Sequence, residues 1–315
     1  MTHIYGLSNA NLAQPSFVTI GVFDGVHKGH QHLIRQLVDE AHSAGHLAVV
    51  ATFFPHPDQV VLGIEGRYYL TAAEERAQYL LELGVDHVVT HPFNEETRMM
   101  RAATFVDLLV ENLQMKQLWV GSDFALGYQR EGDVEFLTKQ GIAKGFDVTI
   151  IDLLQAGNTH VAISSTLIRD ALGQGDVEKV REWLGRGYAV SGKVVAGKKR
   201  GRTIGFPTAN IETWSQQLVP AIGVYAGWVQ IGDERFMAVT NIGTRPTFNN
   251  NSVITIEAHL LDFERDIYEE TVSVSFEKYI RPEMKFDDFQ ALIEQIAKDV
   301  ETGREFLQGI KAVSP

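Results

Sequence analysis

The sequence contains no cysteine among its 315 residues. This excludes disulfide bridges, thiol catalysis and cysteine-ligated zinc, and it fits a reducing compartment, so the cytoplasm is the default expectation. Long apolar runs are also missing, because the longest, residues 47–54, is far too short to cross a bilayer. The N-terminus lacks the basic-then-apolar pattern of a signal peptide. The sequence therefore predicts no membrane association.

Basic residues are scarcer than acidic ones. The 28 Lys and Arg residues against 40 Asp and Glu residues give a formal net charge of −12. Nucleic-acid binding depends on many contacts between basic side chains and phosphates, so this balance argues against a nucleic-acid partner. With 44% hydrophobic and 22% charged residues, the composition is that of a globular protein. The length predicts about two domains.

Residues 17–34 combine an apolar strand pattern, a glycine-rich turn and the start of an amphipathic helix. His27 and His30 stand three residues apart at the helix start, so both imidazoles can lie on one face. Glycines let phosphate oxygens approach the backbone, the N–H groups of a helix start favour an anion, and two imidazole donors could hold charge that develops on phosphorus. A tight connection with surface histidines is the alternative. Besides the two histidines, the residues assigned to this histidine turn (residues 21–30) are Gly21, Phe23, Asp24, Gly25 and Gly29.

Strand and helix patterns alternate up to about residue 186. The chain reads as strands at residues 17–22, 47–54, 86–89, 118–121 and 148–151, with further helices at residues 71–83, 102–112 and 134–144. Thr71 and Glu74 form a capping-box pattern at the start of the helix over residues 71–83. The alternation predicts an α/β doubly wound parallel sheet with its site at the carboxyl ends of the strands.

Polar and aromatic residues follow two of these strands. The candidates after the second strand are Phe54, Pro55 and His56, and those after the fourth are Gly121, Asp123, Phe124 and Arg130. A third segment places the hydroxyls of Ser164, Ser165 and Thr166 at a predicted helix start, with Arg169 one turn later. An N-cap with an exposed arginine explains this segment. A second phosphate cradle explains it too, with Arg169 supplying a planar charged fork.

The pattern changes after residue 186. Short strand-like runs separated by Gly, Asp and Asn turns occur at residues 188–195, 223–230, 236–242, 252–261 and 271–279. They predict an antiparallel β-barrel. A final helix closes the chain, with an apolar face made by Phe289, Leu292, Ile293, Ile296 and Val300. We therefore predict two domains, residues 1–186 and 187–315.

Residues 193–210 form a basic stretch without any acidic residue. Interleaved glycines allow close approach to phosphate, and the Thr208 hydroxyl and Asn210 amide could complete a magnesium–nucleotide site. A solvated basic loop is the alternative. The residues assigned to this nucleotide site are Lys193, Gly197, Gly201, Arg202, Gly205, Phe206, Pro207, Thr208 and Asn210.

In their order along the chain, these motifs resemble the bifunctional bacterial riboflavin kinase/FAD synthetase family. Residues 21–30 resemble the His-x-Gly-His signature of nucleotidylyltransferases, and residues 52–57, 120–124 and 163–169 resemble the FMN adenylyltransferase module. Residues 201–210 resemble the riboflavin kinase signature. The family usually has an aromatic and a basic residue after Asp123–Phe124, whereas this chain has Ala125 and Leu126. That departure concerns flavin or nucleotide contacts of the loop, not the phosphate chemistry.

The resemblance implies a nucleotidylyltransferase-like first domain and a riboflavin kinase-like second domain. The second would phosphorylate riboflavin to FMN, and the first would adenylylate FMN to FAD with release of pyrophosphate, so the implied ligands are ATP, riboflavin, FMN and FAD, with Mg²⁺. Glu257 would be the general base for the ribityl hydroxyl. His27, His30 and Arg169 would stabilise the transition state of adenylylation, and Thr208 and Asn210 would hold the metal. The implied flavin contacts are Phe54, Pro55, His56, Phe124, Arg130, Tyr225 and Arg281.

Two other functions stay open at this point. A nucleotidylyltransferase with a different phosphorylated acceptor is favoured only by Ala125 and Leu126. A flavin-binding regulatory protein without turnover would not need a general base such as Glu257, which argues against it. For Arg281, a surface ion pair with Glu283 is as good an explanation as a flavin or phosphate contact. Self-association into a homo-oligomer is also left open.

Overall fold

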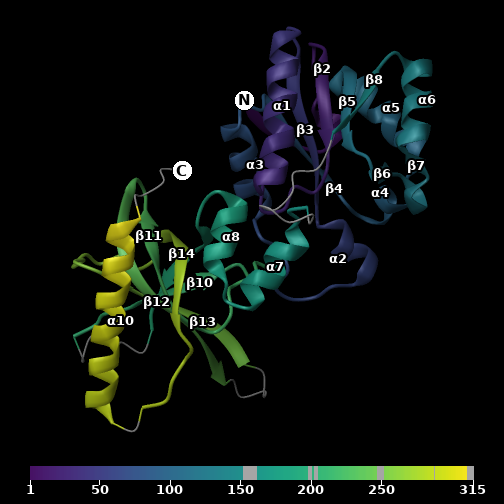
Figure 1. Cartoon of the computed structure of the whole chain (residues 1–315). Coiled ribbons are helices and arrows are strands. Elements are labelled where there is room, and N and C mark those ends of the chain that lie inside the picture. Colours follow the sequence, from purple (N-terminus) through teal and green to yellow (C-terminus); the bar gives the residue numbers. More distant parts are fainter. Residues whose placement is uncertain (152–161, 198–200, 202–204, 247–251, 287, 311–315) are drawn as a thin grey trace. The chain divides into compact units, whose positions relative to one another are not determined.

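The computed structural model forms two compact units, residues 1–165 and 166–315 (Figure 1). The residues that it describes are 1–151, 162–197, 201, 205–246, 252–286 and 288–310. Helices α7 (Ser165–Gly173) and α8 (Val177–Leu184) precede the domain boundary predicted at residue 186. Contacts group them with the second unit, because α8 packs on strands β9 and β14 of that unit.

The first unit contains a six-stranded parallel sheet, which confirms the predicted fold class. Its strands, in spatial order, are β1 (Thr2–Tyr5), β4 (His87–Pro92), β3 (Leu47–Phe54), β2 (Ser16–Ile20), β5 (Met115–Gly121) and β8 (Asp147–Ile151). The sequence did not predict β1. This strand lies at the sheet edge with both terminal residues exposed, so it carries no apolar run.

Helices cover both faces of this sheet. On one face, α1 (Lys28–Ser43) and α3 (Ala73–Glu82) pack on the strands, and on the other face α5 (Ala102–Leu113) and α6 (Val134–Lys144) do so (Figure 1). Strand β3 contributes residues to the hydrophobic cores on both faces. Ala48 and Val50 pack with α1 and α3, and Val49 and Ala51 pack with α5 and α6. Successive strand residues point to opposite faces, so a strand covered on both sides reads as a continuous apolar run.

Short elements complete the first unit. They are η1 (Leu7–Asn9), α2 (Pro57–Leu62), α4 (Glu95–Met99), β6 (Ala125–Leu126), η2 (Tyr128–Arg130) and β7 (Gly132–Asp133). The predicted capping box at Thr71 is wrong, because α3 begins at Ala73 and has no side-chain cap. The Thr71 hydroxyl instead donates to Asp24 Oδ1 at 3.2 Å and accepts from the Gly25 N–H at 3.1 Å. Thr71 therefore holds the histidine turn.

The second unit is a closed antiparallel barrel, as predicted. Its strands are β9 (Tyr188–Val195), β10 (Ala209–Thr213), β11 (Gly223–Ile231), β12 (Glu234–Pro246), β13 (Ser252–Leu260) and β14 (Thr271–Arg281), in the spatial order β10-β13-β12-β11-β14-β9. The sequence analysis missed β10, because it treated the chain up to Asn210 as a phosphate loop. That strand closes the barrel between β9 and β13.

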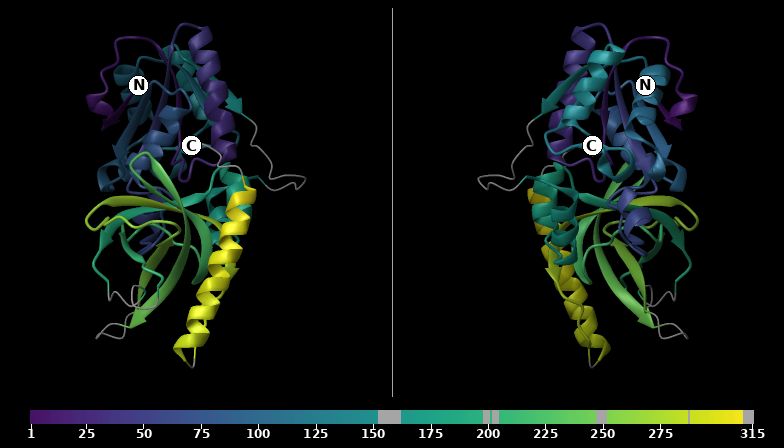
Figure 2. Two further views of the ribbon diagram at one scale, coloured as in Figure 1. Left: turned by 90° about the vertical axis from the view of Figure 1, so that its left-hand side faces the viewer. Right: turned by 90° about the vertical axis from the view of Figure 1, so that its right-hand side faces the viewer.

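Helix α10 (Phe289–Gly309) packs along β11, β12 and β14, as Figure 2 shows. The apolar face predicted for this helix is only partly buried. Phe289 is exposed, and the fully buried residues are Asp299, Gly303 and Leu307. A Cβ on Gly303 would lie 2.9 Å from Val239, so glycine lets the helix approach the barrel closely. Within the described ranges, no helix is both long and apolar enough to cross a membrane.

Candidate active sites

The histidine turn follows the carboxyl end of β2 and has an unusual backbone. Phe23, Gly25 and Val26 have positive φ angles of 53°, 79° and 41°. This conformation is costly for a bulky or β-branched residue, so it persists only where the surroundings hold it. Phe23 and Val26 are buried in the core between α1, α3 and the sheet. The turn is therefore fixed by packing before any ligand binds.

The two histidines lie together, as their spacing predicts. Their rings stack with centroids 3.6 Å apart and planes 20° apart. His27 is the N-cap of α1, and its Nδ1 accepts the His30 N–H at 3.3 Å. The Phe23 ring packs edge-on against His30 at 5.1 Å. A Cβ on Gly29 would lie 3.1 Å from His27, so glycine leaves the stacked rings room.

His30 is held in its neutral form. Burial is the main cause that lowers its pKa well below the ordinary value of 6.5, and the charges of His27 and Arg76 lower it further. The sequence analysis missed Arg76, a fully buried side chain of α3. A neutral imidazole at this site can donate one hydrogen bond to a phosphate oxygen without carrying a net charge.

Asp24 has structural partners in the fold, and its predicted contact with ATP stays a prediction. Its buried carboxylate accepts the N–H groups of Leu70 and Thr71 at 3.0–3.1 Å and the Thr71 hydroxyl. These bonds anchor the turn to the segment before α3. The Ser165 hydroxyl donates to the Asp24 carbonyl at 2.9 Å, which brings the serine segment to the turn.

The other predicted residues of the second cradle have different positions. The Ile163 carbonyl, next to Ser164, lies 3.7 Å from where a Cβ on Gly29 would be. Ser164 therefore follows a residue that borders the histidine turn. Thr166 and Arg169 lie in α7 and belong to the second unit, so their role in adenylylation stays a prediction.

A cavity of about 720 Å³ opens beside Gly21 at the carboxyl ends of the strands. Phe124 and Arg130, two predicted flavin contacts, line it, and so do Gly121 and Asp123. Other lining residues are Ile20, Val22, Phe53, Pro57, Asp58, Val61, Leu62, Phe93, Thr97, Arg98, Met100, Phe105, Ala125, Leu126, Gly127, Tyr128 and Gln129. Aromatic rings with a few polar groups are typical of a site for a planar ligand.

Phe54, Pro55 and His56 do not line this cavity, so their predicted flavin contacts stay predictions. Strand alternation explains this, because Phe53 faces the cavity while the ring of Phe54 lies 5.5 Å from that of Tyr69. His56 is buried as the N-cap of α2: its Nδ1 accepts the Asp58 N–H, and its own N–H donates to the Tyr69 hydroxyl. His56 therefore fixes the start of α2, next to the cavity-lining residues Pro57 and Asp58.

The departure from the family pattern lies in the cavity wall. Ala125 and Leu126 form β6, which pairs with β7. Leu126 is nearly buried and packs into the core, while Ala125 is partly exposed. Arg130 donates to the Asp123 carbonyl at 2.9 Å, so the loop is closed by its own arginine.

The barrel brings the predicted kinase residues together. Glu257 of β13 lies opposite Asn210 of β10 and opposite Asn241 of β12. Its neighbours Ile256 and Ala258 are buried, so Glu257 points to the outer face. Directly opposed side chains of antiparallel strands have Cβ atoms about 4.5–5.5 Å apart. Sequence reasoning does not assign a role to Asn241, because the register between strands depends on residues far apart in the chain.

Glycines shape the approach to Asn210. A Cβ on Gly197 would lie 2.1 Å from Asn210 Nδ2, so any larger residue there would force the Asn210 amide or the chain to move. A Cβ on Gly201 would lie 2.2 Å from the Phe206 carbonyl, and Gly205 has a φ of 85°. The close packing of this chain segment explains the glycine spacing better than charge alone.

The basic residues of the stretch are placed less directly. Lys193 forms an exposed ion pair with Glu269 at 2.5 Å. Such pairs are weak, so a phosphate can compete for the ammonium group. Arg202, which was predicted to bind nucleotide, lies outside the described residues, and so do residues 198–200. The Pro207 carbonyl lies 2.8 Å from His259 Nδ1, and the Phe206 ring packs edge-on against that histidine, which fixes the segment before Thr208.

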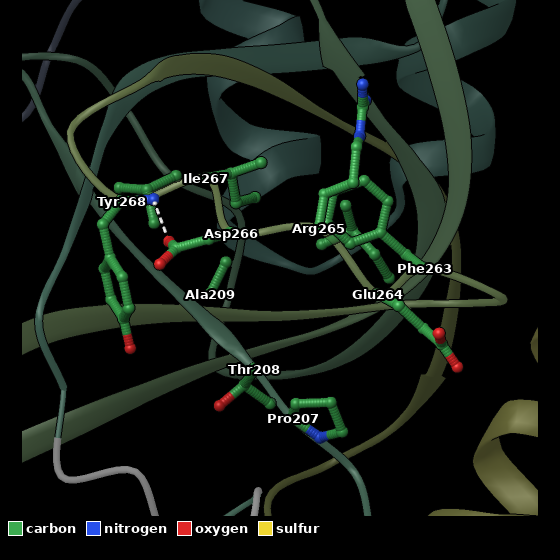
Figure 3. Close-up of a pocket in the computed structure, with 11 residues that line it drawn as sticks. Pro207, Thr208, Ala209, Phe263, Glu264, Arg265, Asp266, Ile267 and Tyr268 are labelled. Carbon is green, nitrogen blue, oxygen red and sulfur yellow. Dashed lines mark hydrogen bonds between the residues drawn. The ribbon is translucent and has the colours of Figure 1, made fainter.

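A cavity of about 210 Å³ borders Thr208. In Figure 3, Pro207, Thr208 and Ala209 face the segment of residues 263–268. That segment follows β13, and the Tyr268 N–H donates to Asp266 Oδ1 at 3.0 Å. Val194 and Leu260 complete the wall. The sequence analysis missed residues 263–268, because they carry no motif or period.

Tyr225 and Arg281 have structural partners. Tyr225 is fully buried, donates its hydroxyl to the Ala221 carbonyl at 2.5 Å, and has its pKa raised by that burial. It packs in the barrel core, and its predicted flavin contact stays a prediction. Arg281 binds Asp299 of α10 with Nε and Nη2 at 2.7–3.0 Å. Its ion-pair partner is therefore Asp299 and not Glu283, and it ties α10 to β14.

Comparisons with known proteins agree with the two sites. The family model for FAD synthetase matches residues 9–167, and that for riboflavin kinase matches residues 184–307. Curated relatives named bifunctional riboflavin kinase/FMN adenylyltransferase come from Escherichia coli K12 (40% identical, 97% of this chain and 98% of the relative), Listeria monocytogenes (37%, 92% and 91%) and Bacillus subtilis (33%, 99% and 98%).

A solved structure has the same fold over nearly the whole chain. It is a Streptococcus pneumoniae crystal structure described as a macrolide-efflux protein, with a TM-score of 0.87 and 30% identity over 96% of this chain and 99% of that one. That name describes a different activity, and we take only the fold from this likeness.

Proposed function

The chain belongs to the family of bifunctional riboflavin kinase/FMN adenylyltransferases, and we propose from its geometry which residues carry each reaction. It phosphorylates riboflavin to FMN and adenylylates FMN to FAD with release of pyrophosphate. Relatives that share 33–40% identity over nearly the full length carry this name, so the other acceptor and the regulatory protein considered above are set aside.

The pairing of Glu257 with Asn210 across neighbouring strands is the observation that supports the kinase site best. We propose that Glu257 accepts the proton of the riboflavin 5′-hydroxyl as that oxygen attacks the γ-phosphorus of ATP. The bond from the γ-phosphorus to the oxygen that bridges it to the β-phosphorus breaks, and ADP leaves. Thr208 and Asn210 supply oxygen donors of the kind that Mg²⁺ prefers, and glycine at 197 leaves space beside Asn210. When bound, Mg²⁺ neutralises charge on the ATP phosphates.

The cavity beside Thr208 supports a place for the rest of ATP. It adjoins the same threonine, and its lining by Phe263, Ile267 and Tyr268 offers apolar and aromatic surface to a base. Pro207 and Ala209 flank Thr208 along the other side. A nucleotide that places its phosphates near Thr208 could therefore bury its base here.

The stacked histidines support the adenylyltransferase site. We propose that an oxygen of the FMN phosphate attacks the α-phosphorus of ATP, and the bond from that phosphorus to the β-phosphate oxygen breaks. His30 is neutral and can donate one hydrogen bond to the phosphate oxygens, and His27 stacks beside it. Ser164, Ser165, Thr166 and Arg169 keep, as a proposal, the role that the family motif gives them. No covalent intermediate is needed.

The cavity beside Gly21 supports binding of the flavin ring. Its volume of about 720 Å³ lies within the range of roughly 300–1,000 Å³ that is usual for small-ligand sites. Phe53, Phe93, Phe105 and Phe124 offer apolar surface to a planar ring.

The simplest test supplies the protein with riboflavin, ATP and Mg²⁺ and follows FMN and FAD by chromatography. Both products should appear, and a chelator should prevent both. We also propose a cytoplasmic location, on the absence of cysteine alone. Light scattering in solution would decide between a monomer and a homo-oligomer.

A further inference from the structure

Arg76 is a fully buried cation to which neither reaction above gives a role. It lies on α3 with 0% of its surface exposed. Its Nη1 donates to the Val22 carbonyl and its Nη2 to the Phe53 carbonyl, both at 2.9 Å. Val22 leads directly into the histidine turn, and Phe53 ends a neighbouring strand at the cavity wall. One guanidinium therefore joins the two strand ends that border the proposed FMN adenylyltransferase site.

The charge of Arg76 is incompletely compensated. Burying a cation is costly unless it is paired, and Arg76 forms no ion pair with a carboxylate within the part of the chain that the structure describes. Asp24, Tyr69 and Glu74 are close enough to oppose the effect of burial on its pKa, yet the net direction is downward. An arginine nevertheless keeps its proton in proteins. Arg76 is therefore a fixed cation beside the histidine turn, and the negative oxygens of a polyphosphate bound at the turn would be attracted to it.

The same charge acts on the histidines around it. It lowers the pKa of His30, together with burial and His27, and it lowers that of His3 on β1, where Glu74 opposes it. Arg76 therefore influences the protonation of a histidine in the turn as well as the position of the turn.

We propose that Arg76 is a positioning residue of the adenylyltransferase site, which joins the ends of β2 and β3 and provides fixed positive charge for the triphosphate and pyrophosphate. The proposal rests on the assignment of adenylylation to the histidine turn. It goes beyond that assignment, because Arg76 lies outside every motif that identifies the site.

The test compares Arg76→Met with Arg76→Lys, and uses Arg35→Met, an exposed arginine of α1, as the matched control. Kinase activity in the same chain reports that the second unit is intact, and urea denaturation reports whether the first unit is folded. We expect Arg76→Met to lower kcat of FMN adenylylation by about 100-fold, as misplaced groups do, and to weaken pyrophosphate binding in calorimetry by at least about tenfold (~1.4 kcal/mol). Arg76→Lys should recover part of the binding because it keeps the charge, and Arg35→Met should change neither quantity.

NMR of histidine-labelled protein adds a measurement that a purely structural role would not move. In Arg76→Met, the His30 ring, identified by its loss in His30→Asn, should titrate at a higher pH than in the unmodified protein, and in Arg76→Lys it should not. Unchanged His30 titration and pyrophosphate binding in Arg76→Met would overturn the proposal. If Arg76→Met does not fold, the test rests on Arg76→Lys, which cannot donate to the Val22 and Phe53 carbonyls in the same two-pronged way. Arg76→Lys must then lower kcat of FMN adenylylation, and an unchanged kcat would overturn the proposal. Normal FMN adenylylation in His30→Asn would instead refute the assignment of the site, while the titration would still decide the role of Arg76.

Discussion

Glu257 and Asn210 lie directly opposite each other on neighbouring strands, although 46 positions separate them in the sequence. The family motif names each of them separately, and the closed barrel makes them neighbours on its outer face. A proton acceptor beside a candidate metal ligand is the arrangement that phosphoryl transfer requires, since the attacking oxygen must meet the metal-bound phosphate.

Asn241 flanks Glu257 on the other side and should help to orient its carboxylate. Asn241→Ala should lower kcat of riboflavin phosphorylation about tenfold and leave FMN adenylylation unchanged. Asn241→Asp places a second negative charge beside Glu257, which should shift the acid limb of the kinase pH profile upward. Steady-state kinetics of both reactions across pH would test this, and an unaltered kinase would rule out the contact.

Gly197 should be essential for ATP binding by the kinase. A Cβ there would lie 2.1 Å from Asn210 Nδ2, so Gly197→Ala must displace the amide or the loop. We expect the KM for ATP in FMN formation to rise about tenfold or more. Gly309→Ala is the matched control, because a Cβ there meets no atom within 4 Å. Equal KM values in the two variants would show that Asn210 need not keep its position.

The fold class followed from the sequence because apolar period and turn chemistry are local properties. The sequence did not predict strands β1 and β10 for physical reasons. The first is a half-exposed edge strand, and the second begins at the end of the glycine-rich basic stretch. Thr71 was read as a cap because its spacing from Glu74 fits one, yet a buried carboxylate at Asp24 recruits its hydroxyl.

Site residues were harder to predict than the fold. Tyr225 belongs to a motif but fills the core, and Arg76 belongs to no motif but supports the site. The positions of both side chains depend on contacts between residues far apart in the chain, and the periodicity of the sequence does not report such contacts.

The ion pair of Arg281 with Asp299 should stabilise the second unit. Asp299 is only 3% exposed, so Arg281→Met leaves a buried carboxylate whose remaining hydrogen-bond partner among the described side chains is Gln295. Breaking one side of such a pair costs about 3–5 kcal/mol of unfolding free energy. Urea denaturation should show this loss, and Arg281→Met combined with Asp299→Leu should recover most of it. Arg304→Met, which breaks an exposed pair, is the control. If the urea midpoint of Arg281→Met equalled that of Arg304→Met, the ion pair of Arg281 with Asp299 would not stabilise the second unit.

His30 should make the first unit sensitive to acid. Its folded-state pKa lies well below 6.5, so as pH falls through 6.5 the unfolded chain binds a proton that the folded chain does not. The stability contributed by neutral His30 is thus present above pH 6.5 and is lost progressively below it. The drop in denaturation midpoint between pH 7.5 and 5.5 should be smaller in His30→Asn than in the unmodified protein. An equal drop would mean that His30 titrates normally in the fold.

The two-site assignment is tested most directly by separating the activities in one chain. Glu257→Gln should abolish FMN formation from riboflavin while FMN-to-FAD conversion proceeds at the rate of the unmodified protein. His27→Ala with His30→Ala should do the opposite, so that riboflavin and ATP yield FMN that accumulates without FAD. Chromatography of both products for each folded variant is the measurement. If either variant lost both activities together, the assignment of the reactions to separate sites would be wrong.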